Sequence, residues 1–188
     1  MHTIPTIDIV DELATEYADK SPSDILKLAL SQKGEVAISF SGAEDVVLID
    51  MASNLGLPFR VFSLDTGRLH PETYQFLETV RKYYNIEIEI CFPETEAVQE
   101  LVQEKGLFSF FEDGHQECCG IRKVQPLRKK LATLDGWITG QRKDQSPGTR
   151  QDIPVVQADA GFSGPNKQLI KYNPLANWSS SDVWNYIR

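Results

Sequence analysis

Residues 35–48 read EVAISFSGAEDVVL, and this stretch decides the fold. Its first six residues form a short apolar run that fits a buried strand. Ser41 and Gly42 then turn the chain into a helix that opens with Glu44 and Asp45, two acids that suit a helix N-terminus. A strand followed at once by a helix is half of a βαβ unit. The stretch therefore predicts a parallel α/β sheet.

The same alternation continues along the chain. Four strand-then-helix units predict one α/β domain over residues 1–188, with a parallel sheet and helices on both faces. Ligands of such sheets bind at the carboxyl ends of the strands. Strands are expected at 35–40, 60–64, 86–92 and 136–140, a hairpin at 153–159 and 168–174, and helices at 21–34, 44–56, 72–84, 96–106, 126–134 and 178–188.

Composition narrows the class of protein. The chain has 188 residues, 41% of them hydrophobic, with no apolar run long enough for a transmembrane helix and no secretory signal at its start. We therefore expect a cytoplasmic protein. Three cysteines are too few for a disulfide framework. The net charge of −8 argues against a nucleic-acid partner and against an acidic membrane surface.

The charge is unevenly distributed. Residues 122–150 hold eight lysines and arginines against two aspartates, a net charge of +6, so the rest of the chain carries −14. A basic segment in an acidic chain favours a local anionic ligand. The alternative, a helix with a solvated basic face, stays open for residues 128–130.

The turn at 41–45 has two interpretations. Free backbone N–H groups and the helix dipole would favour an anion at Ser41 and Gly42. The acids Glu44 and Asp45 are unusual beside a phosphate, so an ordinary turn with a capped helix is equally open. The spacing matches neither the dinucleotide fingerprint nor the Walker A loop.

Two further strand tips carry candidate residues. Leu64 could pack against a base, and the turn after it is shaped by residues 65–67. Gly140 would allow a close approach to the backbone, while Arg142 and Arg150 flank a Ser-Pro-Gly turn and could close on an anion. The alternative is that both are ordinary surface loops.

Cys118 and Cys119 are adjacent, and Arg122 and Lys123 follow them closely. Adjacent cysteines form a disulfide only with strain. The pair could hold a metal or cluster, act as redox thiols or serve as structural thiols. The guanidinium of Arg122 suits a bidentate contact with an oxyanion, and the ammonium of Lys123 suits a point-charge contact.

Several strings together carry a family resemblance. SGAEDVVL resembles the modified PP-loop of adenine nucleotide alpha-hydrolase-like proteins. FSLDTGRLHPETYQF, KGLFSFFEDGHQECCGIRKVQPL and TGQRKDQSPGTR resemble the assimilatory adenylylsulfate (APS) reductases, sister enzymes of the phosphoadenylylsulfate (PAPS) reductases, from about residue 20 to 188. With the physical reading, this gives a substrate-binding set of Ser39, Phe40, Ser41, Gly42, Asp45, Leu64, Asp65, Thr66, Gly67, Arg122, Lys123, Gly140, Gln141, Arg142 and Arg150.

The resemblance implies reduction of adenylylsulfate to sulfite and AMP in sulfate assimilation. A C-terminal cysteine attacks the sulfur and releases AMP, and a thioredoxin- or glutaredoxin-type dithiol then frees sulfite. The family holds a [4Fe–4S] cluster with a Cys-Cys pair and a later C-x-x-C, which makes Cys118 and Cys119 two of its ligands. A homo-oligomer is compatible with this reading.

The sequence departs from the family at two points. It contains no C-x-x-C and no E-C-G-L-H segment, and Cys91 reads as a small strand residue. We therefore expect a chain that lacks the family's C-terminal part, binds nucleotide and does not reduce it. A PAPS reductase is the first alternative. An ATP pyrophosphatase is the second alternative. Its loop reads S-G-G-x-D-S, and in this sequence Ala43 replaces the second glycine and Val46 replaces the last serine, which counts against it.

Overall fold

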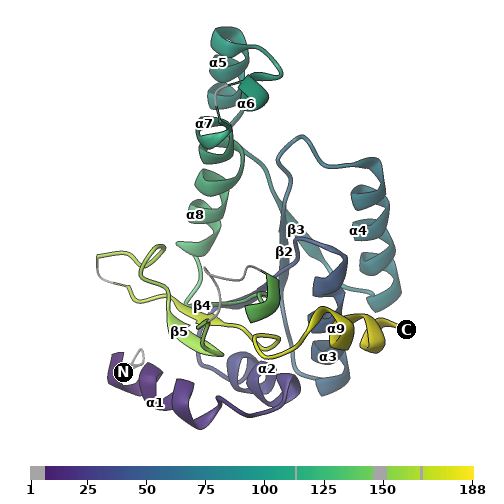
Figure 1. Ribbon diagram of the computed structural model, residues 1–188, viewed down its shortest axis with the longest axis vertical. Helices are drawn as coiled ribbons and strands as arrows, with labels where there is room; N and C mark the ends of the chain where they lie inside the picture. The colour runs from purple at the N-terminus through teal and green to yellow at the C-terminus, as the bar shows by residue number, and fades with distance from the viewer. Residues whose placement is uncertain (1–6, 113, 146–151, 166) are drawn as a thin grey trace.

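The computed structural model describes residues 7–112, 114–145, 152–165 and 167–188, built around a six-stranded sheet of order β3-β2-β1-β4-β6-β5 (Figure 1). Neighbouring strands are parallel except for β5, which runs antiparallel to β6. The predicted parallel α/β class and the predicted hairpin are therefore confirmed. The strands are β1 (Val36–Ser39), β2 (Val61–Leu64), β3 (Ile88–Cys91), β4 (Gly136–Ile138), β5 (Val156–Ala158) and β6 (Ile170–Tyr172).

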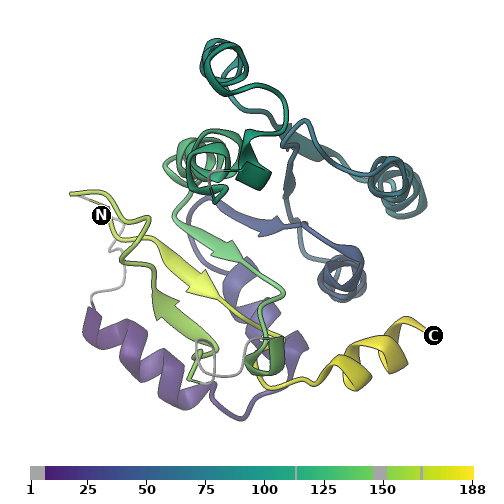
Figure 2. The ribbon, with the colours of Figure 1, turned by 45° about the horizontal axis from the view of Figure 1, so that its top comes forward.

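Two cores cover the two faces of the sheet because successive strand residues point to opposite sides. On one face Ile38 of β1 and Ile138 of β4 join the larger core, and on the other Ala37 and Trp137 join the smaller one. Figure 2 shows helices on both sides of the strands. The larger core packs against α1 (Ile7–Glu16), α2 (Pro22–Leu30), α3 (Val46–Leu55), α4 (Pro71–Tyr84) and α9 (Ser180–Ile187), and the smaller core against α8 (Gln125–Leu131).

Most helix ends follow local chemistry. The Ser21 hydroxyl caps α2 by accepting from the Asp24 N–H at 3.2 Å. Ser179 and Asp182 form a capping box at the start of α9. Gly56 ends α3 with a φ of 64°, in the left-handed region that glycine tolerates. The sequence prediction contained no counterpart of α1 or of α6 (Ser109–Glu112), whereas α5 (Thr95–Lys105) matches its expected position.

The helix expected at 126–134 is confirmed as α8, which begins at Gln125, has Pro126 in its first turn and ends at Leu131. The sequence did not predict the helical residues that precede it. The helical run comprises α7 (Gln116–Cys119), a π-helical turn η2 (Gly120–Val124) and α8. Proline normally starts a helix because it has no N–H to donate. The wide turn before α8 changes the hydrogen-bond pattern at this point, which allows the proline to sit inside a continuous run.

None of the helices in these described ranges combines the length and the apolar content needed to cross a membrane. Figure 1 shows the run from α7 to α8 standing beside the sheet, with α5 and α6 at its far end and α4 on the opposite side. This arrangement brings the cysteine-bearing helix toward the ends of the strands.

Candidate nucleotide and thiol site

The candidate site lies at the carboxyl ends of β1, β2 and β4. From β1 the chain moves outward to β2 and β3, and then returns across the sheet to β4 on the other side of β1. The crevice between such strands is the usual ligand position in open α/β sheets. Three of the predicted loops, at 41–45, 65–68 and 139–145, therefore begin at one edge.

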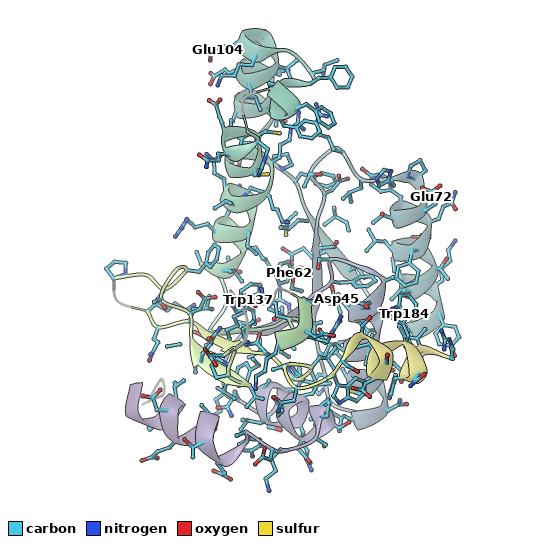
Figure 3. The ribbon with its side chains drawn as sticks, in the orientation of Figure 1. Asp45, Phe62, Glu72, Glu104, Trp137 and Trp184 are labelled. Carbon is cyan, nitrogen blue, oxygen red and sulfur yellow. The ribbon has the colours of Figure 1, made fainter. Side chains whose placement is uncertain are left out.

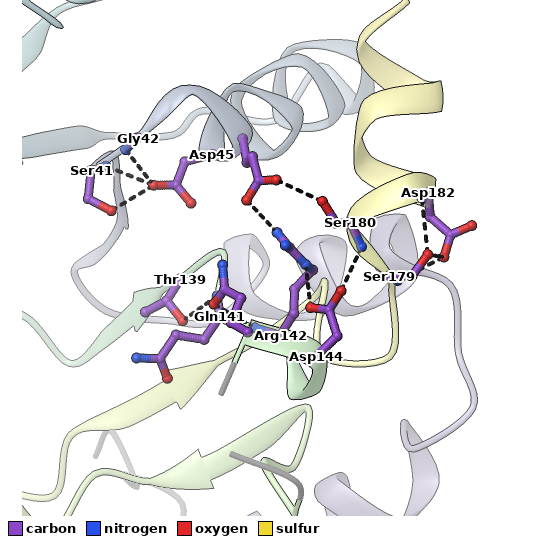
Figure 4. A network of polar contacts seen from close by, with 12 residues as sticks. Ser41, Gly42, Asp45, Thr139, Gln141, Arg142, Asp144, Ser179, Ser180 and Asp182 are labelled. Carbon is purple, nitrogen blue, oxygen red and sulfur yellow. Dashed lines mark hydrogen bonds and ion pairs between the residues drawn. The ribbon is translucent and has the colours of Figure 1, made fainter. Parts of the chain in front are cut away.

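The turn after β1 is closed by its own carboxylate. Asp45 Oδ2 accepts from the Ser41 N–H and the Ser41 hydroxyl, both at 2.8 Å, and from the Gly42 N–H at 3.0 Å (Figure 4). These are the donors that the sequence offered to an anion. In this structure they donate to a side chain of the same turn, which agrees with the capped-turn interpretation.

Asp45 is buried where the ends of β1 and β4 meet. A Cβ atom placed on Gly140 would lie 2.0 Å from Asp45 Oδ1, so a side chain at residue 140 cannot fit beside this carboxylate. Burial raises the pKa of Asp45 above its usual value, against the three hydrogen bonds that favour ionisation. The glycine at the strand tip is explained by this close approach.

The turn after β2 is ordered by Asp65, which is buried. Its Oδ1 accepts from the Gly67 N–H at 2.7 Å and from the Tyr74 hydroxyl at 2.9 Å. Its own N–H donates to the Cys91 carbonyl at 3.0 Å, which continues the β2–β3 ladder. Gly67 has a φ of 71°, which favours glycine. The structure thus assigns residues 65–67 to shaping the turn, as predicted.

A pocket of about 400 Å³ adjoins the turn after β1. Phe40, Ser41 and Gly42, predicted from the sequence, line one side of it. The rest of the lining was missed: Ala43, Ser63 and, on the first turns of α4, Glu72, Thr73, Phe76 and Leu77. The available signal was the amphipathic pattern of α4, on which residues 73, 76 and 77 share a face. Figure 3 labels Glu72 at the start of this helix.

Arg142 is buried in an ion-pair network beyond β4 (Figure 4). Its Nη1 donates to Glu44 Oε2 at 2.8 Å, and its Nε donates to Asp144 Oδ1 at 3.0 Å. The second oxygen of Asp144 accepts from the Ser180 N–H at 2.7 Å, at the start of α9. The charge of Arg142 is therefore shared between two carboxylates, which join the first turn of η1 (Ala43–Asp45) to α9.

The remaining predicted residues differ in accessibility. Ser39 and Leu64 are half-buried at the ends of their strands. The Gln141 side chain accepts from Lys171 Nζ at 2.8 Å. Lys123 is exposed and has no hydrogen bond or ion pair within the described part of the chain. Arg150 lies outside the described residues, so its predicted contact stays a prediction.

Arg122 joins the cysteine-bearing helix to the turn after β2. Its Nη1 donates to the Thr66 carbonyl at 2.9 Å, and a Cβ on Gly67 would lie 3.2 Å from the same nitrogen. The Arg122 side chain is buried, and its Nε has no hydrogen-bond partner. Two parts of the predicted set, 56 residues apart in the chain, are thus brought into contact.

Cys118 is buried and Cys119 is exposed, and both are free thiols on α7. Thiolates are suitable ligands for an iron–sulfur cluster. The pair fits such a cluster in the kind of donor and supplies two of the four ligands that it needs. Within the described residues, no three cysteine, histidine or acidic side chains are grouped so that they could hold a metal ion. Cys91 lies on β3, and its thiol faces Glu89 Oε1 at 3.9 Å.

Comparison with solved structures supports the fold. The crystal structure of a phosphoadenylyl-sulfate (PAPS) reductase from Candida auris, a phosphate complex, superposes with a TM-score of 0.78. It covers 100% of this chain and 88% of that one at 24% identity, a level that shows the fold alone.

Comparison of sequences shows the family. An adenosine 5'-phosphosulfate reductase of Pseudomonas aeruginosa is 58% identical over 94% of this chain and 66% of its own length. The chloroplastic 5'-adenylylsulfate reductase 1 of Arabidopsis thaliana is 58% identical over 97% of this chain and 40% of its own length. An adenosine 5'-phosphosulfate reductase of Neisseria meningitidis is 36% identical over 98% of this chain and 75% of its own length.

The chain thus spans less than two thirds of the Pseudomonas and Arabidopsis relatives. The sequence model of the phosphoadenosine phosphosulfate reductase domain family matches residues 35–188. This match covers most of the chain, and it includes the turn after β1, the cysteine pair and the loop after β4. The chain belongs to the phosphoadenosine phosphosulfate reductase domain family.

Proposed function

We propose that this chain is the nucleotide-binding part of an adenylylsulfate reductase, and that it binds adenylylsulfate and AMP at the carboxyl edge of β1, β2 and β4. The observation that carries the proposal is the contact between Arg122 and Thr66, 2.9 Å between Nη1 and the carbonyl oxygen. It places the cysteine-bearing helix directly against the turn after β2, at the carboxyl edge of the sheet. The names of the relatives at 58% identity support adenylylsulfate as the substrate.

The chain's own residues would divide the task by position. The pocket beside Phe40 and Gly42 and the tip at Leu64 offer apolar surface and backbone groups to a base. Gly140 and Gln141 close the opposite side at the end of β4. Arg122, Lys123 and Arg150 supply positive charge for the phosphate and sulfate groups. Asp45, Asp65 and Arg142 hold the three loops in place through the contacts described above.

Cys118 and Cys119 would provide two ligands of a [4Fe–4S] cluster. When bound, such a cluster would place a compact charged group beside the nucleotide. The cysteine that attacks the sulfur of adenylylsulfate would come from an E-C-G-L-H segment, which the 188 residues do not contain. A thioredoxin-type dithiol would then release sulfite from the S-sulfocysteine.

ATP is a poorer substrate for this geometry. A pyrophosphatase loop binds the pyrophosphate of ATP through the backbone N–H groups after the strand. Here the Ser41 and Gly42 N–H groups already donate to Asp45, and Glu44 adds a second acid to the turn. A polyphosphate would therefore meet negative charge where it needs donors.

Calorimetric titration of the chain with adenylylsulfate, PAPS, AMP and ATP tests the proposal. We expect adenylylsulfate to bind most tightly, AMP to follow and ATP to be the weakest. Tightest binding of ATP would refute the reductase assignment, and tightest binding of PAPS would move it to the sister enzyme. In a coupled assay with thioredoxin we expect no sulfite above background, because the attacking cysteine is not in this sequence.

A further inference from the structure

Lys171 is a buried cation in the middle of the sheet. It lies on β6 between Ile170 and Tyr172, which both join the larger core, so its own side chain points to the opposite face. On that face it pairs in register with Trp137 of β4, a residue of the smaller core. Lys171 is only 9% exposed, although lysine is rarely buried because taking its charge out of water is costly. Its position therefore indicates a role beyond packing.

Two contacts fix the ammonium group of Lys171 near the end of β4. Nζ lies 4.9 Å from the centroid of the Trp137 ring, within the range of a cation–π interaction. Nζ also donates to Oε1 of Gln141 at 2.8 Å. Gln141 follows Gly140 at the carboxyl edge of the sheet, and its backbone N–H donates to the Thr139 hydroxyl at 3.4 Å (Figure 4). The lysine thus reaches from the interior of a strand to a residue of the candidate site.

The ammonium group determines which end of the Gln141 amide is available to a ligand. An ammonium group only donates hydrogen bonds, so the amide oxygen, which accepts, must face it. The amide nitrogen Nε2 then points away from Lys171, and among the residues that the structure describes it has no hydrogen-bond partner. Gln141 is half-buried rather than buried, so a ligand can reach its side chain. The end of this side chain that is left for a ligand is therefore a donor.

We propose that Lys171 is a positioning residue, which orients the Gln141 amide so that Nε2 donates a hydrogen bond to an oxygen of the bound nucleotide. This inference rests on the proposed function, and it adds the residue that sets the polarity of one contact. The oxygen belongs to the ribose or to the phosphate group, because both accept from an amide N–H. Without Lys171 the amide is free to turn over, and its oxygen would then face the ligand and leave that acceptor without a donor.

A double-mutant cycle tests whether Lys171 acts through Gln141. AMP and adenosine are titrated calorimetrically into the wild-type chain, Lys171→Met, Gln141→Met and the variant that carries both changes. Lys129→Met is the matched control, because it also removes one lysine, but from an exposed ion pair with Glu94. Lys171→Arg is the conservative variant, because a guanidinium group also donates and never accepts.

We expect each single change to methionine in the cycle to weaken AMP binding by about 3- to 10-fold, the range for one neutral hydrogen bond. The double variant should lose no more affinity than Gln141→Met, because Lys171 has nothing to orient once the amide is gone. Lys171→Arg should recover most of the affinity, and Lys129→Met should bind as the wild type does. Adenosine separates the two oxygens, because an equal loss indicates the ribose and an unchanged affinity indicates the phosphate.

Unchanged AMP affinity in Lys171→Met would overturn the inference. Losses that multiply in the double variant would also overturn it, because Lys171 would then act on the ligand or on the fold independently of Gln141. If the wild-type chain bound neither AMP nor adenosine, the proposed function itself would fail, and this inference with it.

A measurement on the wild-type chain covers the case in which the Lys171 variants do not fold. The side-chain amide of Gln141 gives a pair of signals in nitrogen-edited NMR spectra, one for each hydrogen on Nε2. We expect this pair to shift when AMP is added, because one of the two hydrogens gains an acceptor. A pair that stays in place, in a chain that binds AMP, would refute the contact.

Discussion

Gly140 and Asp45 approach so closely that a methyl group on residue 140 would lie 2.0 Å from the Asp45 carboxylate oxygen. This contact joins the tip of β4 to the turn after β1 across the centre of the sheet. Asp45 has little freedom to move aside, because Ser41 and Gly42 donate three hydrogen bonds to its other oxygen. The pair therefore sets the width of the proposed nucleotide crevice.

Gly140→Ala is expected to destabilise the fold by about 1–3 kcal/mol, the usual cost of overpacking, and to reduce AMP affinity. Urea unfolding and calorimetry measure the two effects. Gly164→Ala is the control, because a Cβ there meets no atom within 4 Å. Wild-type stability and AMP affinity in Gly140→Ala would show that the contact is not restrictive.

Asp45→Asn tests the buried carboxylate through its pH dependence. Burial holds the pKa of Asp45 above its usual 3.8 in the folded chain. At pH values above about 4 the folded state therefore binds more protons than the unfolded state. The stability contributed by Asp45 should then fall as pH rises from about 4. We expect the unfolding free energy of wild type minus that of Asp45→Asn to decrease between pH 4 and 8. An increase over the same range would contradict the burial argument.

Arg142→Met should cost about 2–4 kcal/mol, because it leaves Glu44 and Asp144 without their buried partner, although both acids keep some contact with water. Hydrogen exchange in α9 should also accelerate, since Asp144 holds the Ser180 N–H. Arg60→Met, which removes exposed ion pairs, should cost less than about 1 kcal/mol. Equal costs for the two variants would mean that the network in Figure 4 adds no stability.

The three thiols should react with a maleimide in a fixed order in the iron-free chain. Cys119 is exposed and should be modified first, and Cys118 is buried and should be protected. Cys91 should also be slow, because burial raises the pKa of its thiol and lowers the thiolate fraction at neutral pH. Peptide mapping by mass spectrometry gives the order. Faster labelling of Cys91 than of Cys119 would contradict the arrangement of α7.

Local patterns were sufficient for most of the fold. Short apolar runs located the strands, and Ser21 and Gly56 located helix ends, because both signals depend on residues close together in the chain. Pro126 located the start of α8 correctly, whereas the π-helical turn before it was missed because it leaves no clear sequence signal. The missing lining of the pocket, such as Phe76 on α4, required knowing which helix covers the β1 turn.

The sequence by itself determined the order of the strands along the chain, the turns at 41–45 and 65–67, the adjacent thiols and the family resemblance. The tertiary structure decided which charges are neutralised. Arg142 and Arg122 are the same residue type, yet Arg142 is paired with two acids. Arg122 donates to a backbone carbonyl, and its Nε has no hydrogen-bond partner. The reason is physical: hydrogen bonds and burial depend on residues 50 to 100 positions apart, which only the packed sheet brings together.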